Sequence, residues 1–318
     1  MLPLRNIYLH VTLACQSRCA HCYASAGTPL PDELSAGEIA RFWADAVAVH
    51  PERLIVTGGE PLLRPDLFDL LQSLRDADPR RTMRRCLNTN GRLVTRDVAA
   101  RLADLVDEVR VSVDGTADVH DSLRGEGSFE LALRALAHLR AAGVAMRAVI
   151  TASKSGLAGL DHLLLFLRDR GVATIQVNPL KRVGRGAEHA AEVVDPATLR
   201  AAHERAWHRL FPQAAPTQPS QAAPASTNCG IGKYLNVMPD GDIYPCHVLM
   251  RPELRLGNVR ADRLADICAP DGPLARLRAL DFGALAKQDP RLGALARPGV
   301  CLGEVPAACD AIGLGLMT

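Results

Sequence analysis

Short runs of β-branched and apolar residues alternate with longer amphipathic patterns through the first two-thirds of this 318-residue chain. The runs have the length of strands, and the amphipathic patterns have the length of helices that cover a sheet. Strands that are separated by helices pair in parallel, because each crossover returns the chain to the same end of the sheet. The alternation therefore predicts an α/β fold of six strand-helix units. The strands are predicted at residues 7–12, 53–57, 84–89, 108–114, 144–151 and 173–178.

Two helices have start signals that support this prediction. Ser35 is followed three residues later by Glu38, which is the pattern of a capping box for a helix over residues 35–50. Asp195 is a candidate cap for a helix over residues 196–211.

The composition changes after this last helix. Residues 212–227 are rich in Pro, Ala, Gln and Ser and predict a linker, and cysteines reappear directly after them. We therefore predict a partial (β/α)6 TIM-like barrel over residues 1–194, a helix and linker over 195–227, and a small cysteine-rich domain of β-hairpin and helix over 228–318.

Composition excludes several classes of protein. Hydrophobic residues make up 48% and charged residues 23% of the chain, as in globular proteins with a large core. A net charge of +2 requires neither a nucleic acid nor a membrane surface as partner. No signal peptide and no apolar run long enough to span a membrane are expected. Nine cysteines are too few for a disulfide scaffold, so we expect a cytoplasmic protein whose clustered, reduced thiols bind metal.

Three cysteines follow the first predicted strand in a C-x3-C-x2-C array: Cys15, Cys19 and Cys22. A [4Fe-4S] cluster held by protein alone takes four cysteine ligands, so three ligands on one loop leave one iron open. Metal sites with an open position are typically reactive, whereas closed sites are structural. A zinc site completed by His21, which lies inside the array, and three unrelated thiols are the alternatives. The array favours a reactive iron-sulfur site.

Polar or glycine-rich segments follow the other predicted strands. In a parallel barrel, reactive groups gather at the carboxyl ends of the strands. Any one segment is also explained by the preference of Gly, Asn and Asp for turns. Their joint placement beside the cysteine loop predicts a single functional rim. The segments are residues 57–61 (TGGEP), 88–91 (NTNG), 112–115 (SVDG) and 178–180 (NPL).

The cysteine array followed by Tyr23, together with Gly-Gly-Glu-Pro after the second strand, resembles the radical S-adenosylmethionine (SAM) superfamily over residues 5–190. The resemblance implies that Cys15, Cys19 and Cys22 hold a [4Fe-4S] cluster whose open iron binds the amino and carboxylate groups of SAM. It implies that one electron from the reduced cluster cleaves SAM to methionine and a 5′-deoxyadenosyl radical, which removes a hydrogen atom from the substrate. An external one-electron donor of the flavodoxin or ferredoxin type is then required.

The same resemblance assigns further residues to SAM binding. Glycine permits close backbone approach, and a glutamate accepts a hydrogen bond from an ammonium group. For the arginine in this set, an exposed position on a helix without a ligand is the alternative. The residues are Tyr23 on the loop, Gly58, Gly59 and Glu60 at the amino group, Ser112 at the ribose or carboxylate, Arg124 at the carboxylate and Leu180 beside adenine.

A second cysteine set lies near the C-terminus. Pro-Asp-Gly at residues 239–241 predicts a hairpin turn that brings Cys229 and Cys246 together at the base of the hairpin. This pattern resembles the opening of the SPASM and twitch extensions, which hold auxiliary iron-sulfur clusters. The further cysteine run of a full SPASM extension is not found, so we expect one auxiliary [4Fe-4S] cluster, with Cys301 and Cys309 as its remaining ligands.

Three more residues have alternative interpretations. Cys86 and Cys268 are predicted as small core residues, with Cys268 as an alternative ligand of the auxiliary cluster. His247 directly follows Cys246, where sulfatase-maturing relatives have an aspartate that deprotonates the substrate. We predict His247 as a catalytic base, and a structural histidine is the alternative.

Three hypotheses about function follow. The first is a peptide maturase that crosslinks, epimerises or oxidises a ribosomally made precursor; it is expected to need a separate peptide-recognition protein or contacts from the rim. The second is a radical SAM dehydrogenase or decarboxylase of a small molecule or tetrapyrrole. The third is a non-catalytic iron-sulfur carrier, against which the Gly-Gly-Glu rim and Arg124 argue.

Overall fold

The computed structural model describes residues 4–210, 231–280 and 287. The predicted linker and three of the predicted cluster ligands, Cys229, Cys301 and Cys309, lie outside these residues. Within the described ranges, no helix is both long enough and apolar enough to cross a membrane.

The six predicted strands are confirmed, with shifts of a few residues at their ends. They are β1 (Asn6–His10), β2 (Arg53–Thr57), β3 (Arg84–Thr89), β4 (Glu108–Ser112), β5 (Met146–Ala152) and β6 (Thr174–Pro179). Helices alternate with them along the chain. These are α1 (Ala36–Ala48), α2 (Leu67–Ala77), α3 (Arg96–Ala103), α4 (Ala117–Arg124), α5 (Ser128–Ala141), α6 (Lys154–Leu157), α7 (Leu160–Asp169) and α8 (Pro196–Leu210).

The predicted helix caps are confirmed. Ser35 and Glu38 form the capping box of α1, and Asp195 accepts a hydrogen bond from Thr198 N–H at 2.9 Å at the start of α8. Two features differ from the expectation. Helix α4 was not predicted, and two separate helices, α6 and α7, lie between β5 and β6.

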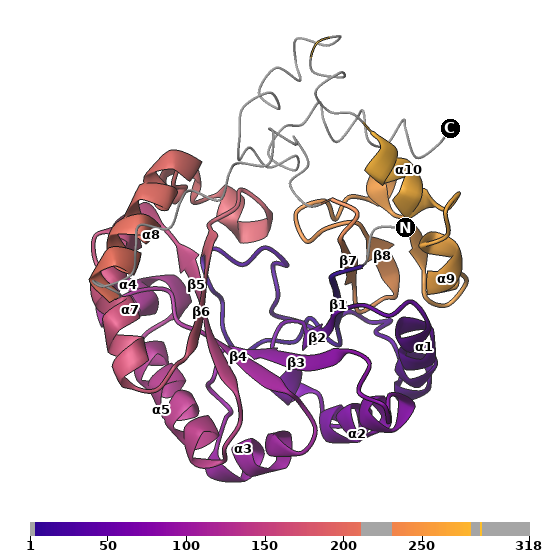
Figure 1. Ribbon diagram of the computed structural model, residues 1–318, viewed down its shortest axis with the longest axis horizontal. Helices are drawn as coiled ribbons and strands as arrows, with labels where there is room; N and C mark the ends of the chain where they lie inside the picture. Colours follow the sequence, from indigo (N-terminus) through magenta and orange to yellow (C-terminus); the bar gives the residue numbers. More distant parts are fainter. Residues whose placement is uncertain (1–3, 211–230, 281–286, 288–318) are drawn as a thin grey trace.

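The parallel strands form a curved sheet with helices on its outer side (Figure 1). The order β6-β5-β4-β3-β2-β1 is that of a partial barrel, which confirms the predicted fold class. Alternate residues of a strand face opposite sides. In β1, Ile7 and Leu9 pack with Trp43 of α1 in the outer core, whereas Tyr8 and His10 face inward. The inner side is therefore polar and is available for chemistry.

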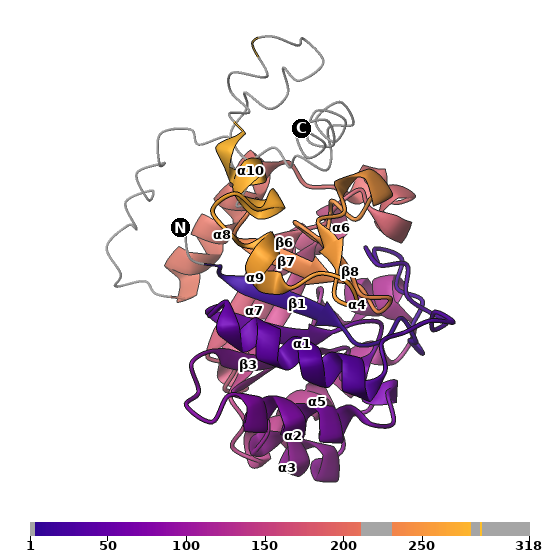
Figure 2. The same cartoon turned by 90° about the vertical axis from the view of Figure 1, so that its right-hand side faces the viewer.

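The C-terminal segment continues the same sheet. Strand β7 (Tyr234–Val237) pairs in parallel with β1, and β8 (Asp242–Tyr244) and β9 (Gly257–Asn258) follow as antiparallel strands. Figure 2 shows this hairpin beside β1. Two short helices complete the segment, α9 (Leu264–Ile267) and α10 (Pro273–Ala279). The domain boundaries expected at residues 194 and 228 stay predictions.

Candidate active site

The cysteine array lies on the loop that leaves the carboxyl end of β1. The loop closes at its base, where Cys15 N–H donates to Gly27 O and Gly27 N–H donates to Leu13 O, both at 2.9 Å. Cys19 is buried, Cys15 and Cys22 are half-buried, and all three are free thiols. One short, closed segment therefore carries all three thiols.

The thiols interact electrostatically with one another and with nearby cations. Burial raises the pKa of Cys15, and the neighbouring Cys19 and Cys22 add to the increase. Burial also raises the pKa of Cys19, although the Arg124 and Arg185 guanidinium groups oppose it. A cysteine binds metal as the thiolate, which nearby cations favour. The surroundings of Cys19 are therefore suited to a metal-bound thiolate.

The donor set fits a [4Fe-4S] cluster better than a single zinc ion. No three His, Cys, Asp or Glu side chains in the described ranges are arranged to hold one metal ion. His21, the alternative zinc ligand, lies against Asp114 instead, with 3.0 Å between His21 Nε2 and Asp114 Oδ2. Cys15 Sγ accepts a hydrogen bond from Ser17 N–H at 3.4 Å, and hydrogen bonds to sulfur are one means by which proteins tune iron-sulfur clusters.

The Gly-Gly-Glu segment after β2 packs directly on the cysteine loop. Gly59 N–H donates to Thr12 O, and Glu60 N–H donates to Ala14 O, both at 2.8 Å. A Cβ atom on Gly58 would lie 2.3 Å from Thr12 O, and one on Gly59 would lie 2.3 Å from Ala14 O. Only glycine permits this approach. The Gly-Gly-Glu segment, which is predicted to bind SAM, therefore also shapes the loop that carries the thiols.

Glu60 is fully buried and joins the ends of β2 and β3. Its Oε1 accepts hydrogen bonds from Thr89 Oγ1 at 2.9 Å and Leu62 N–H at 3.2 Å, and its Oε2 accepts from Asn90 N–H at 2.8 Å. Burial raises the pKa of Glu60 to about 7 against these hydrogen bonds. A bound cation would favour the charged form. Contact between Glu60 and the SAM amino group stays a prediction.

Arg124, the last residue of α4, belongs to a buried ion-pair cluster at the end of β4. Its Nε donates to Asp114 Oδ2 at 2.5 Å, and Asp114 Oδ1 accepts from Thr151 N–H at 2.8 Å. Its terminal nitrogens face the cysteine loop: Nη1 lies 3.9 Å from Cys19 Sγ, and Nη2 lies 3.3 Å from His21 Nε2. Burial raises the pKa of Asp114, but Arg124 and His21 outweigh it and hold that pKa well below its usual range. Arg124 is thus not an exposed residue on a helix.

The other predicted SAM contacts lie at the same ends of the strands. Ser112 is half-buried at the end of β4. Leu180 is buried directly after β6, and its N–H donates to Ala152 O at 3.1 Å. Tyr23 is half-buried on the cysteine loop. The structure therefore brings the predicted residues of the barrel to one rim.

His10, at the end of β1, was not predicted as part of the site. It is fully buried, and its Nε2 lies 3.1 Å from Asn236 Oδ1 of β7 and 3.2 Å from the Tyr23 hydroxyl. Burial lowers the pKa of His10 to about 4, so the imidazole is neutral. His10 connects the cysteine loop to the C-terminal hairpin. In the sequence, the signal for this role is a histidine between the apolar residues Leu9 and Val11, where the strand ends.

The C-terminal hairpin brings Cys246 and His247 next to the cysteine loop. Cys246 is half-buried, with its Sγ 3.7 Å from His247 Nδ1. His247 is exposed, and its ring lies 5.2 Å from that of Tyr23 between centroids. Cys86 and Cys268 are buried, as predicted.

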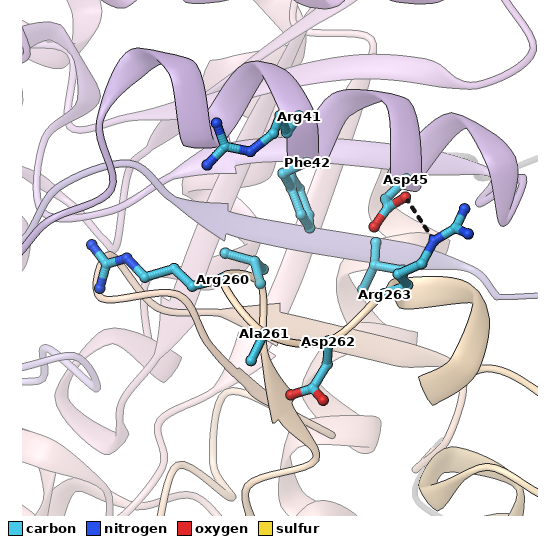
Figure 3. Close-up of a pocket in the computed structure, with 9 residues that line it drawn as sticks. Arg41, Phe42, Asp45, Arg260, Ala261, Asp262 and Arg263 are labelled. Atoms are coloured by element: carbon cyan, nitrogen blue, oxygen red, sulfur yellow. Dashed lines mark ion pairs between the residues drawn. The ribbon is translucent and has the colours of Figure 1, made fainter.

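A surface pocket of about 240 Å³ lies elsewhere, between α1 and the turn after β9 (Figure 3). Arg263 Nε and Asp45 Oδ1 face each other at 3.8 Å at one end of it. None of the predicted site residues lines this pocket, so it is separate from the rim.

Two protein-family models match the chain. The model of the radical SAM superfamily matches residues 9–153. The SPASM model, an iron-sulfur cluster-binding domain, matches residues 229–292. The second match includes Cys229, Cys246 and Cys268 and ends before Cys301.

Individual relatives agree with these matches. Mycofactocin maturase MftC of Mycobacterium ulcerans is 34% identical over 280 residues, which cover 84% of this chain and 74% of the relative. The AdoMet-dependent heme synthase of Methanosarcina barkeri is 33% identical over 211 residues, covering 65% of this chain and 58% of the relative. Streptococcus suis SuiB, solved with S-adenosylmethionine, shares the fold with a TM-score of 0.72 at 16% identity, covering 87% of this chain and 68% of SuiB.

The thiol loop, the packed Gly-Gly-Glu segment and the two family matches lead to one assignment. The chain is an enzyme, which sets aside the hypothesis of a non-catalytic carrier. Its cofactors are SAM, a SAM-binding [4Fe-4S] cluster and an auxiliary iron-sulfur centre. The chain therefore belongs to the radical SAM superfamily and carries a C-terminal SPASM iron-sulfur domain.

Proposed function

We propose that the enzyme modifies a ribosomally made precursor peptide by forming a crosslink, epimerising a residue or oxidising a side chain. The observation that carries this proposal is the 34% identity to MftC, a maturase, over 84% of the chain. SuiB, which has the same fold, has also been crystallised with its precursor peptide SuiA.

Within this proposal, Cys15, Cys19 and Cys22 hold the SAM-binding cluster. Their placement on one closed loop and the Arg124 guanidinium beside Cys19 support the assignment. When bound, the cluster and SAM supply the one-electron cleavage of SAM and the removal of a hydrogen atom from the substrate. The protein orients the reactants and excludes water.

We assign the SAM carboxylate to Arg124. Because Asp114 occupies Nε, the guanidinium is held in one orientation with Nη1 and Nη2 toward the cysteine loop. Two parallel N–H donors match the geometry of a carboxylate. Gly58 and Gly59 lie against the same loop, and the absence of their side chains lets the carbonyl oxygens of Thr12 and Ala14 approach.

We assign proton acceptance from the substrate to His247. Its ring is exposed beside Tyr23, and its Nδ1 faces Cys246, which leaves Nε2 for the substrate. The auxiliary centre next to this residue is suited to take up the electron that remains on the substrate. The proposal also includes an electron donor of the flavodoxin or ferredoxin type and a separate peptide-recognition protein. It includes a cytoplasmic location, because thiols are kept reduced in the cytoplasm.

The peptide proposal predicts a chemical change in a co-expressed peptide, which for a crosslink or an oxidation is a change in mass. We expect a short peptide encoded beside this gene to lose hydrogen, or to gain a crosslink, when it is produced with the enzyme under anaerobic conditions. Mass spectrometry with fragmentation measures this change, and the variant lacking Cys15, Cys19 and Cys22 serves as control.

A peptide that stays unmodified while the enzyme cleaves SAM would favour the second candidate, a small-molecule or tetrapyrrole substrate. The identity to the AdoMet-dependent heme synthase is the observation behind that candidate. An epimerised residue leaves the mass unchanged, so the peptide is also hydrolysed and its amino acids are resolved by chirality.

The auxiliary cluster predicts a specific iron count. Each [4Fe-4S] cluster holds four irons, so we expect about eight irons per chain after anaerobic reconstitution. Replacing Cys229 and Cys246 with alanine is expected to lower the count to about four irons, because the SAM-binding cluster remains. Iron analysis measures this, with Cys86→Ala as the matched control. A count near four in the wild type, unchanged in the double variant, would contradict the auxiliary [4Fe-4S] cluster.

A further inference from the structure

The barrel is open on one side in the described part of the chain. Strand β6 pairs with β5 alone, and β1 lies at the other end of the arc of six parallel strands (Figure 1). Among the described residues, no strand ladder joins these two ends. The cysteine loop follows β1, so its position relative to β6 depends on contacts between loops.

One residue after β6 makes those contacts. Arg185 N–H donates to Cys22 O at 3.0 Å, its Nε donates to Cys19 O at 2.8 Å, and its Nη1 donates to Ala26 O at 2.9 Å. These three carbonyls are spread over the cysteine loop from its second ligand to its base. Arg185 therefore holds the loop from the far side of the barrel opening.

The glycines on either side of Arg185 make this approach sterically feasible. Gly184 has a φ of +57°, and a Cβ atom on it would lie 2.5 Å from Cys22 O and 2.4 Å from Tyr23 O. A Cβ atom on Gly186 would lie 2.4 Å from Lys181 O. Only glycine adopts such a conformation at such distances without strain. The backbone at Gly184 therefore lies directly against Cys22, which carries the third thiol, and against Tyr23.

The guanidinium group of Arg185 also places a positive charge beside the cysteine loop. Its guanidinium lies close enough to Cys19 to act on the thiol electrostatically. Its Nη2 is buried and has no hydrogen-bond partner among the described residues.

We propose that Arg185 is a positioning residue for the SAM-binding cluster, which it serves by fixing the carbonyls of the cysteine loop across the open side of the barrel. The inference rests on the proposed assignment of Cys15, Cys19 and Cys22 to that cluster. An arginine suits this task because its planar group donates in several fixed directions at once. A lysine in the same place keeps the charge but donates from a single point.

The test compares Arg185→Met, Arg185→Lys and the wild type, with Arg182→Met as matched control because Arg182 is exposed on the same segment. Removing residues that orient metal ligands typically weakens metal binding by about 10- to 100-fold. We expect a chelator to remove iron from the SAM-binding cluster of Arg185→Met faster by a factor in this range. The auxiliary cluster, and both clusters in Arg182→Met, should release iron at the wild-type rate. Electron paramagnetic resonance identifies the SAM-binding cluster by its response to added SAM.

A second readout separates charge from geometry. Loss of a positive charge beside an iron-sulfur cluster lowers its reduction potential. The midpoint potential of the SAM-binding cluster is therefore expected to fall in Arg185→Met and to stay near the wild-type value in Arg185→Lys, whereas both variants release iron faster.

Two outcomes would overturn the proposal. One is a wild-type iron-release rate and potential in Arg185→Met. The other is equal acceleration of iron release from both clusters with a lower unfolding midpoint, which would mean that Arg185 only stabilises the fold. The iron measurements do not depend on the substrate, so a failure of the peptide proposal is distinguishable from a failure of this one.

Discussion

Replacing Cys15, Cys19 and Cys22 together with alanine is expected to abolish the cleavage of SAM. The loop then has no thiolate to offer, and a [4Fe-4S] cluster cannot be retained without its cysteine ligands. His21, the alternative ligand inside the array, is already paired with Asp114. Chromatographic detection of 5′-deoxyadenosine with a chemical reductant measures the loss. We expect no product above the enzyme-free background.

The matched control is Cys86→Ala. Cys86 is a buried free thiol in β3, away from the cysteine loop, so its removal creates a small cavity and leaves the three predicted ligands intact. We expect this variant to keep SAM cleavage and iron content near wild type. Continued SAM cleavage by the triple variant would show that the ligand assignment is wrong.

Asp114→Asn is expected to destabilise the protein strongly. The Asp114 side chain is fully buried, and it is paired with Arg124 at 2.5 Å and with His21 at 3.0 Å. Removing one partner of a buried ion pair leaves an uncompensated charge and typically costs about 3–5 kcal/mol in the free energy of unfolding. Urea denaturation of the cluster-free protein measures this cost. The surface pair of Arg168 and Asp169 provides the control Asp169→Asn, for which we expect a change of about 0–1 kcal/mol.

The pH dependence of this effect has a defined sign. The pKa of the Asp114 carboxyl is lowered in the folded state, so the ion pair stabilises the protein at a pH above the ordinary carboxyl pKa of about 4. The difference between Asp114→Asn and wild type should therefore be full near neutral pH and shrink as the pH falls below about 4.

A double variant tests the pairing itself. Asp114→Asn combined with Arg124→Met should cost less than the sum of the two single changes, because no unpaired charge is left behind. Strict additivity would show that the two side chains do not stabilise each other.

Local sequence patterns were sufficient to predict much of the fold. The strands β1–β6 and the capping box at Ser35 depend on residues close together in the chain, where periodicity and cap chemistry are informative. The thiols and the rim were also predictable, because chemistry requires those residue types at the ends of parallel strands.

Other features depend on contacts that a local pattern does not contain. Strand β7 pairs with β1 although more than 200 residues separate them, and the residues of neither strand identify the other as its partner. Helix α4 is short and polar, and Arg124 at its end is held by Asp114 of a different element. Arg185 binds backbone carbonyls, which every residue has, so nothing in the sequence identified its partners.

The parallel pairing of β7 with β1 constrains the distance between the two iron-sulfur regions. Backbone hydrogen bonds, and not the connecting segment, set the spacing between the strand that leads to the cysteine loop and the strand that begins the hairpin of Cys246. The rate of electron tunnelling between two centres depends steeply on their separation. A shared sheet makes that separation insensitive to insertions and deletions between β6 and β7. The connecting region can thus change in length without changing the distance between the two strands that lead to the iron-sulfur regions.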